Sequence, residues 1–356
     1  MNYTLDELST QVRRDILRMV HKVNSGHPGG SLGCTEFLVA LYCKIMNRKD
    51  NFEMNGKDED IFFLSNGHIS QVLYSVLART GYFPVDELNT FRLLNSRLQG
   101  HPTTHEGLPG VRIASGSLGQ GLSVAIGAAE AKKLNKDKNL IYSLHGDGEL
   151  QEGQNWEAIM YASAKKIDNL IATVDLNGKQ IDGSTDDVLP MGSIKTKFEA
   201  FDWQVIEIEN GNNIDDVLKG MEKAKSMTGK GKPICVLLKT IMGNGVDFMM
   251  HTHAWHGKAP NDEQLKSALS QNKETIGERA DFNIAELAIY NRKLNDQELE
   301  KIKKYLEDRY MHGKGGISIP EHTHDVIPEH EHEQSNHSLK VVKGIQNRYN
   351  FESFKD

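Results

Sequence analysis

Asp147 lies between two glycines in the stretch HGDGELQEG, residues 145–153, directly after the apolar run NLIYSL. The flanking glycines let the backbone turn sharply and let a large ligand approach closely. A carboxylate at the end of a strand can hold a divalent cation, and that cation can bridge to a diphosphate. An ordinary strand-to-helix turn can have the same local sequence, so this interpretation needs a partner elsewhere in the chain.

Asn177 supplies that partner, in the stretch VDLNG, residues 174–178. We expect an apolar strand to end here, and a parallel neighbour would place Asn177 beside Asp147. An amide oxygen is a suitable second ligand for a hard cation. The two stretches together therefore predict a divalent-cation site.

Apolar runs that end in polar or glycine residues predict strands, and apolar residues at helical spacing predict helices. Several strands are apolar throughout, which favours an α/β fold, a parallel sheet with helices on both faces. In such sheets ligands bind beyond the carboxyl ends of the strands, and the polar clusters SNGH, HGDGE, DLNG and GNG all fall there. The expected strands lie within 60–68, 139–149, 169–178, 203–210 and 233–245, and the expected helices within 5–23, 34–46, 69–79, 116–134, 155–166 and 213–227.

The order of GDG, a helix and a strand that ends in Asn resembles the thiamine diphosphate enzymes. Among these, seven motifs resemble transketolase in the same order, over about residues 5–270, and AWHGKAPND is most similar to the stand-alone amino-terminal subunit of split transketolases. The resemblance implies the thiamine diphosphate-binding fold. The motifs are SGHPGGSLG (25–33), SNGH (65–68), QGHP (99–102), SGSLGQG (115–121), GDGELQEG (146–153), LNGKQIDG (176–183) and WHGKAP (255–260).

The resemblance also implies which residues hold the cofactor. Mg²⁺ or Ca²⁺ would be bound by Asp147, Asn177 and the backbone carbonyl of Lys179, and Glu152 would match the family glutamate that links cofactor sites across a dimer interface. The residues expected at thiamine diphosphate are His68, Gly116, Leu118, Gly146, Asp147, Gly148, Glu152, Asn177, Ile181 and His256, and those expected to act on the sugar are His27, His68, His101 and His256.

These four sugar-site histidines each lie in a loop bounded by glycine or proline. Ketol transfer moves protons between substrate oxygens, and imidazole titrates near neutral pH. A neutral imidazole can also polarise a carbonyl or hold an alkoxide. His21 and His105 are interpreted as ordinary polar residues, while His145 stands where the family usually has a small or apolar residue, and either tunes the site or faces the next helix.

The resemblance further implies a pyrimidine-binding domain with a glutamate that activates the cofactor. The residues after 270 number 356 − 270 = 86, too few for that domain. We therefore expect ketol transfer between ketose and aldose phosphates by a subunit that is inactive without a carboxy-terminal subunit, in a homodimer or heterotetramer. The alternatives are a non-catalytic cofactor-fold remnant or binding protein, and another thiamine-dependent ketol or aldehyde transferase.

The chain divides by composition into three parts. We expect residues 1–270 to form the cofactor- and metal-binding domain. Residues 271–310 predict a strand and a helix that resemble the end of a laminin-G-type, lectin-like jelly roll, without the strands with which they would pair. Residues 311–356, rich in His and Glu, predict a mobile tail, which is favoured over a transition-metal site because the histidine spacing is irregular.

The overall composition argues against several classes of function. The net charge of −7, with both signs mixed, provides no basic surface for nucleic acid. The sequence contains no run of eighteen apolar residues, so we expect no membrane-spanning helix, and the N-terminus lacks a signal-peptide core. Cys34, Cys43 and Cys235 fit neither a disulfide framework nor a zinc site, so we expect reduced thiols in a cytoplasmic protein.

Overall fold

Five short strands form one parallel sheet in the order β1-β2-β3-β7-β6. Four of them are buried along their whole length or in all but the last residue, as expected of a parallel sheet covered on both faces. A separate two-residue ladder joins β4 to β5. The strands are β1 (Ile61–Leu64), β2 (Ile141–Gly146), β3 (Leu170–Leu176), β4 (Lys179–Gln180), β5 (Gly183–Ser184), β6 (Gln204–Ile208) and β7 (Ile234–Lys239).

The computed structural model describes residues 3–49 and 51–273, which belong to the first of two units of the chain, Met1–Ile276. The predicted strand and helix of residues 271–310 and the predicted tail of 311–356 lie outside the described residues, apart from positions 271–273. The domain boundaries drawn from composition therefore stay predictions. Within the described part of the chain, no helix has the length and apolar character needed to span a lipid bilayer.

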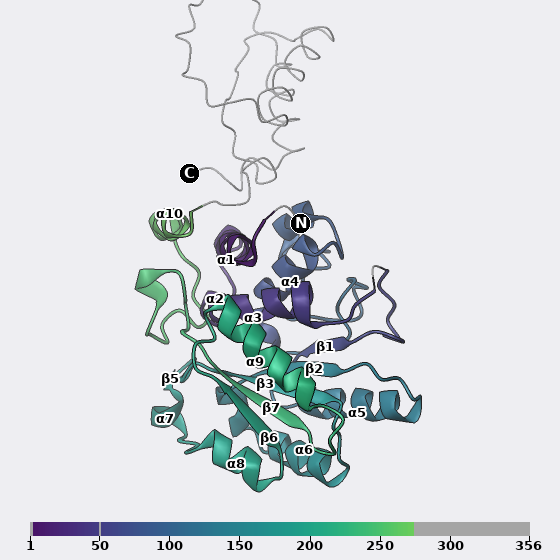
Figure 1. Ribbon diagram of the computed structural model, residues 1–356. Coiled ribbons are helices and arrows are strands. Elements are labelled where there is room, and N and C mark those ends of the chain that lie inside the picture. The colour runs from purple at the N-terminus through teal and green to yellow at the C-terminus, as the bar shows by residue number, and fades with distance from the viewer. Residues whose placement is uncertain (1–2, 50, 274–356) are drawn as a thin grey trace, which may run out of the picture. The chain divides into compact units, whose positions relative to one another are not determined.

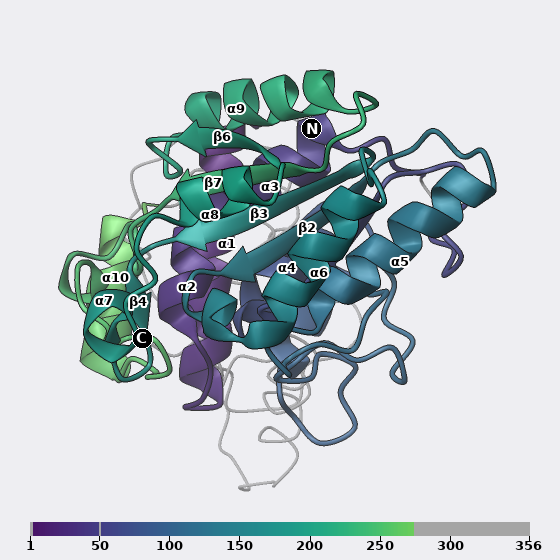
Figure 2. The same cartoon turned by 90° about the horizontal axis from the view of Figure 1, so that it is seen from below.

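Helices cover both faces of the sheet, which confirms the predicted fold class. Figure 1 shows α3, α4 and α9 on one side of the strands and α6 and α8 on the other, and the view in Figure 2 brings α5 and α6 in front of them. The helices are α1 (Leu5–Lys22), α2 (Pro28–Gly33), α3 (Thr35–Ala40), α4 (Ser70–Arg79), α5 (Gly121–Leu134), α6 (Gly153–Ala164), α7 (Thr185–Val188), α8 (Ile194–Ala200), α9 (Ile214–Met227) and α10 (Asp262–Gln271).

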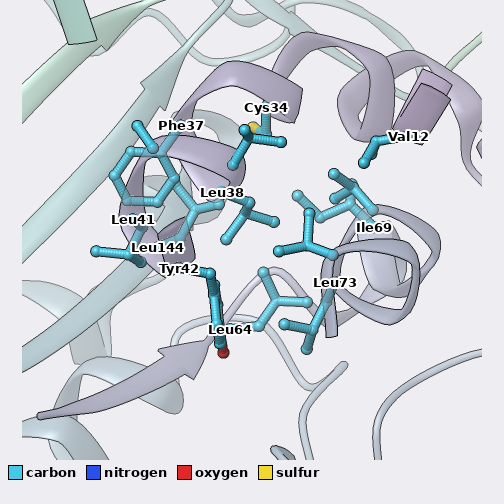
Figure 3. Packing of buried hydrophobic residues seen from close by; sticks show 14 of the residues in the cluster. Val12, Cys34, Phe37, Leu38, Leu41, Tyr42, Leu64, Ile69, Leu73 and Leu144 are labelled. Atoms are coloured by element: carbon cyan, nitrogen blue, oxygen red, sulfur yellow. The ribbon is translucent and has the colours of Figure 1, made fainter. Parts of the chain in front are cut away.

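Alternate residues of each strand supply two hydrophobic cores, because successive side chains of a strand point to opposite faces. In β1, Phe62 and Leu64 join the larger core, whereas Ile61 and Phe63 join the smaller one. Figure 3 shows part of the larger core, where side chains of α3 and α4 meet Leu64 and Leu144 of the sheet. The helices on both faces of the sheet are therefore packed against the strands whose ends carry the polar clusters.

The structure differs from the expected elements in several places, because α7, α8 and α10 were not expected and because the first glycine-rich motif folds differently. The expected helix 34–46 is instead α3 followed by a single π turn, Leu41–Ile45, and the preceding glycine-rich segment is itself helical as α2. Gly29 and Gly30 fit there because an added Cβ would lie within 3 Å of Met242 and Ile69, respectively. Close packing against these neighbours overrides the low helix propensity of glycine.

Candidate active site

Asp147 lies where β2 gives way to the loop before α6, beside the end of β3. Gly146 pairs with Asp175 in the parallel register of the two strands. The Asp147 carboxylate accepts hydrogen bonds from the amides of Gly148, at 2.8 Å, and of Gly178, at 2.6 Å. The structure thus brings the GDG loop against the loop that contains Asn177, as the sequence predicted.

The side chain of Asn177 is held in one orientation by its neighbours. Its Nδ2 donates to Asp175 Oδ2 at 2.7 Å, and its Oδ1 accepts from the Lys179 amide at 2.8 Å. Asp175 also accepts a hydrogen bond from the hydroxyl of Thr240, which follows β7. This arrangement fixes a ligand-type amide through a second layer of hydrogen bonds, as is usual around metal ligands.

The electrostatics at this edge favour a cation. Asp147 and Asp175 are each only 2% exposed, and neither forms an ion pair with a basic side chain in the described part of the chain. Burial, and then the charge of Asp175, raise the pKa of Asp147 to about 7. A cation beside Asp147 would reverse this cost of burying negative charge.

The available donors fit a hard cation. They are a carboxylate, an amide oxygen and backbone carbonyls, which suit Mg²⁺ or Ca²⁺. The residues that the structure describes include no group of three or more His, Cys, Asp or Glu side chains suited to a metal ion. The donor set therefore differs from that of a typical zinc site.

The four histidines expected to act on the sugar form one cluster. The ring centre of His27 lies 5.2 Å from that of His68, 5.7 Å from that of His256 and 6.2 Å from that of His101. His68 and His256 are stacked, with centres 5.0 Å apart. Residues from four separate motifs are therefore neighbours in space.

The cluster favours neutral imidazoles. Burial, followed by His256, Arg92 and His101, lowers the pKa of His27 to about 4. Burial is also the first cause that lowers the pKa values of His68, His101 and His256. Rings that stay neutral at physiological pH can accept a proton or donate a hydrogen bond from a ring nitrogen.

Several buried polar atoms around the cluster lack a hydrogen-bond partner among the described residues. A buried polar atom without a protein partner can be satisfied by a ligand, an ion or water. Other buried atoms elsewhere in the described part of the chain also lack a partner, but those of the histidine loops and the β4 segment would fit a polar ligand. The atoms are Nδ1 of His27, Nδ1 of His256, Oδ1 of Asn66, Oγ of Ser115 and Oε1 of Gln180.

Glycines let the surrounding loops approach one another. A Cβ on Gly67 would lie 2.5 Å from Ser115 Oγ, and one on Gly116, whose φ is +128°, would lie 2.7 Å from His101 Cδ2. At Gly121 an added Cβ would overlap the side chain of Ser65. The loop after β1 and the loop before α5 therefore pack too closely for a side chain at Gly67 or Gly121.

The other predicted cofactor residues differ in their exposure. Leu118 is half-buried in the turn before α5, whereas Glu152, at the start of α6, is exposed. Ile181 is 60% exposed after β4, and Lys179 pairs with Ser184 in the β4–β5 ladder. The contact of Glu152 with another cofactor site stays a prediction.

Glu149 is a site residue that the sequence analysis missed. It is 3% exposed, and its carboxylate accepts hydrogen bonds from the Ser65 hydroxyl, the Gly119 amide at 2.9 Å and the Gly146 amide at 3.0 Å. Burial raises its pKa, but nearby groups, His145 first, lower it below the ordinary value overall. One carboxylate therefore connects three loops of the site.

His145 is buried beside this carboxylate and does not face solvent. Its Nδ1 lies 3.9 Å from Glu149 Oε1, and its Nε2 lies 2.9 Å from Ser143 Oγ. The pair of His145 and Glu149 could have been found from the sequence, since an unusual histidine precedes a glutamate by four residues across a sharp turn. Asp175 could have been found as an acidic residue inside an otherwise apolar strand.

Comparison with known proteins identifies the family. The family model described as the transketolase thiamine diphosphate binding domain matches residues 6–313. The chain belongs to the transketolase family. The match extends past residue 270, where composition placed a boundary.

Separate transketolase subunits are among its relatives. A 6-deoxy-6-sulfo-D-fructose transketolase subunit from Clostridium sp. (strain MSTE9) is 38% identical over 75% of this chain and 95% of its own length. One of the subunits of an apulose-4-phosphate transketolase from Actinobacillus succinogenes is 39% identical over 77% of this chain and 98% of its own length. This chain therefore matches these subunits along nearly their whole length.

Other transketolases extend well beyond the matched region. The solved transketolase from Campylobacter jejuni is 33% identical, with a TM-score of 0.68, and the match covers 76% of this chain but 43% of that one. The transketolase of Geobacillus stearothermophilus is 32% identical, with 44% of its length covered. This transketolase-family chain thus spans less than half of these relatives.

The depressed pKa of His27 predicts a pH-dependent stability. Between about pH 6.5 and pH 4 the unfolded chain binds more protons at this position than the folded chain. The free energy of unfolding should therefore fall as the pH falls through this window. We expect His27→Gln to reduce that fall, measured by urea unfolding at several pH values. The control His105→Gln, at an exposed position, should keep the wild-type dependence, and an unchanged slope in His27→Gln would contradict the prediction.

Replacement of Glu149 should destabilise the fold. In Glu149→Gln an amide NH₂ replaces one acceptor oxygen, so at least one loop donor loses its partner at a cost of about 1–3 kcal/mol. The urea midpoint should fall accordingly. Glu152→Gln makes the same chemical change at an exposed position and should leave the midpoint unchanged. Equal midpoints for the two variants would show that Glu149 does not connect the loops.

Proposed function

We propose that this chain is the amino-terminal subunit of a two-chain transketolase and transfers a two-carbon ketol unit from a ketose to an aldose phosphate. The observation that carries the proposal is the cluster of four neutral histidines close to the Asp147–Asn177 edge of the sheet. The matched relatives of similar length, which are named as transketolase subunits, support a division of the enzyme between chains.

Asp147, Asn177 and the Lys179 carbonyl would hold Mg²⁺ or Ca²⁺, and such a cation would offset the negative charge of a diphosphate. The chemistry that thiamine diphosphate supplies when bound is a stabilised carbanion, which amino-acid side chains do not provide. Gly116 and Gly148 leave room for close approach, and Glu149 keeps their loops in place. These residues thus orient the cofactor rather than react.

The histidines would handle the protons of the sugar. As the C2–C3 bond of the ketose breaks, the C3 hydroxyl loses its proton, the shortened aldose leaves, and the electron pair stays with the two-carbon unit. This unit then forms a new carbon–carbon bond to the acceptor carbonyl, whose oxygen takes up a proton. Nδ1 of His27 and Nδ1 of His256, both unpartnered among the described residues, are suited to hold these protons.

The partner and substrate classes follow from the same proposal. The proposed partner is a carboxy-terminal chain that binds the pyrimidine ring, in an assembly with two copies of this chain. The substrates would be sugars with a terminal oxyanion, since the two relatives above are named for a sulfonated and a phosphorylated ketose. We place the reaction in the cytoplasm, because the three cysteines are free, as in a reducing compartment.

The division between chains is tested by complementation. The purified chain with xylulose 5-phosphate, ribose 5-phosphate, thiamine diphosphate and Mg²⁺ should show no ketol transfer, because the activating glutamate would come from the partner. Addition of a transketolase carboxy-terminal subunit should restore turnover. Full activity of the chain alone would contradict the proposal, and failure with every such subunit would favour a non-catalytic protein.

The cation site is tested at Asp147. We expect Asp147→Ala to abolish divalent-ion-dependent binding of thiamine diphosphate in the presence of the complementing subunit, measured by calorimetry. The variant should still fold, because it removes a carboxylate whose burial is costly, and circular dichroism checks this. Asp215→Ala, at an exposed position in α9, is the control. Wild-type affinity in Asp147→Ala would disprove the assignment.

A further inference from the structure

The four neighbouring histidines come from separate loops, and one helix is joined to three of these loops. His68 lies in the short 3₁₀ helix Gly67–Ile69, and α4 begins at the next residue, Ser70. The place of the His68 ring is therefore tied to the start of α4. This start, residues 70–74, also carries the polar side chains of Ser70, Gln71 and Tyr74.

Ser70 and Tyr74 hold the segment that precedes His101. The Ser70 hydroxyl donates to the Gly100 carbonyl at 2.9 Å, and the Tyr74 hydroxyl donates to the Gln99 carbonyl at 2.8 Å. The two side chains are four residues apart, so they lie on the same side of the helix. Burial raises the pKa of the Tyr74 phenol, so this hydroxyl stays protonated and remains a donor at neutral pH. Two consecutive carbonyls next to His101 are therefore bound to α4.

Gln71 contacts the loop that carries His27. The Ser31 hydroxyl lies 2.8 Å from Gln71 Oε1 and 2.7 Å from the His27 carbonyl oxygen, and both oxygens accept a hydrogen bond from it. The Gln71 amide also lies against the same loop at Gly26, where an added Cβ would be 3.0 Å from Nε2. The backbone at His27 is therefore joined to α4 through one serine hydroxyl.

The rest of α4 is fixed independently of the histidine loops. Ser75 Oγ donates to Asp15 Oδ2 of α1 at 2.6 Å, and Arg79 donates to both oxygens of the same carboxylate, at 2.6 and 2.8 Å. Figure 3 shows Leu73 of α4 among the side chains of the larger core. Because these contacts are made to α1 and to the core, α4 has a fixed position to which the loops are bound.

The three polar side chains at the start of α4 occupy fully buried positions. Ser70, Gln71 and Tyr74 are each 0% exposed. Burial of a polar group costs stability unless the group is hydrogen-bonded, and Nε2 of Gln71 has no hydrogen-bond partner in the described part of the chain. Apolar side chains would fill the same space without that cost. Hydrogen bonds inside a core specify one arrangement of the groups that they join, and this is what the polar residues add here.

We propose that the three polar residues at the start of α4 are positioning residues, which hold the loops of His27 and His101 at a set distance from His68. This assignment rests on the proposed function, because it concerns the spacing of the rings that would handle the protons of the sugar. The ring centre of His27 lies 5.2 Å from that of His68 and 6.2 Å from that of His101. A misplacement of about 1 Å can lower a rate about 100-fold, so this spacing matters to turnover.

Ring resonances of selectively labelled histidines in the chain alone test the positioning without turnover. In the double variant Ser70→Ala/Tyr74→Phe the segment before His101 loses both hydrogen bonds, so we expect the largest change at the His101 ring. The titration midpoint of this ring should also rise, because burial, and then the charge of Arg92, lower the pKa of His101 while the loop is held.

The second variant and the control change the same helix. In Gln71→Met an apolar side chain of similar volume removes the contact with the serine hydroxyl, so the largest change should be at the His27 ring. Ser75→Ala makes the same chemical change as Ser70→Ala but removes a hydrogen bond to α1. It should lower the urea midpoint and leave the rings of His27 and His101 as in the wild type.

Turnover of the complemented enzyme tests the consequence for the reaction. With xylulose 5-phosphate and ribose 5-phosphate, the double variant and Gln71→Met should each lower kcat about 10- to 100-fold, since the proton-handling rings are displaced. Ser75→Ala should lower kcat by less than about threefold. An effect of lost stability alone would appear in all three variants.

The outcomes separate this proposal from the proposed function. Unchanged ring resonances or unchanged kcat in the double variant and in Gln71→Met, or equal changes in Ser75→Ala, would overturn the positioning role. If the wild-type complex shows no turnover but the ring resonances respond as expected, the proposed function fails and the positioning role stands. If the double variant does not fold, the single variants Ser70→Ala and Tyr74→Phe decide, and unchanged His101 resonances in both overturn the proposal.

Discussion

Two buried carboxylates at the ends of neighbouring strands constrain much of this structure. Asp147 and Asp175 are brought together by the parallel register of β2 and β3, and burial makes their charged forms costly. The cost of burying the Asp147 carboxylate is reduced by hydrogen bonds from amides of two loops. The cost for Asp175 is reduced by hydrogen bonds from Thr240, Asn177 and the Cys34 thiol. The loops after three strands and the start of α3 therefore take their positions from the need to satisfy two acids.

Burial has the opposite effect on the histidines, because it raises the pKa of Asp147 but lowers the pKa of His27. In the proposed function this site holds a dianionic cofactor and moves protons, and permanently charged lysine and arginine side chains have pKa values too high to exchange protons near neutral pH. Burial lowers the pKa of His27 to about 4, and burial lowers the pKa values of the other three rings in the cluster as well. In the proposed function the two kinds of group have different roles, because the carboxylates would bind a cation and the imidazole rings would handle the protons of the sugar.

The sequence predicted the layers and the strand ends, because these depend on local apolar runs and on glycines. It also predicted that Asp147 and Asn177 meet, since consecutive parallel strands are commonly neighbours. It could not place β7 between β3 and β6, which depends on packing between distant segments. Glu149 was missed for the same reason, because its partners Ser65 and Gly119 lie 84 and 30 residues away. The helix α2 could not be predicted, because its glycine-rich sequence has a low helix propensity and becomes helical only through tertiary contacts.

The interlocking glycines determine where this site is open to change. At Gly67, Gly116 and Gly121 even one added carbon would overlap a neighbouring loop, so the loops that hold the histidines are tightly packed. Gln99, Thr103 and Glu106 border open volume instead. A protein engineer who wants a different sugar accepted has two kinds of position here. Changes at the glycines would force the packed loops apart, whereas changes at Gln99, Thr103 and Glu106 would reshape the open volume without displacing the histidine rings.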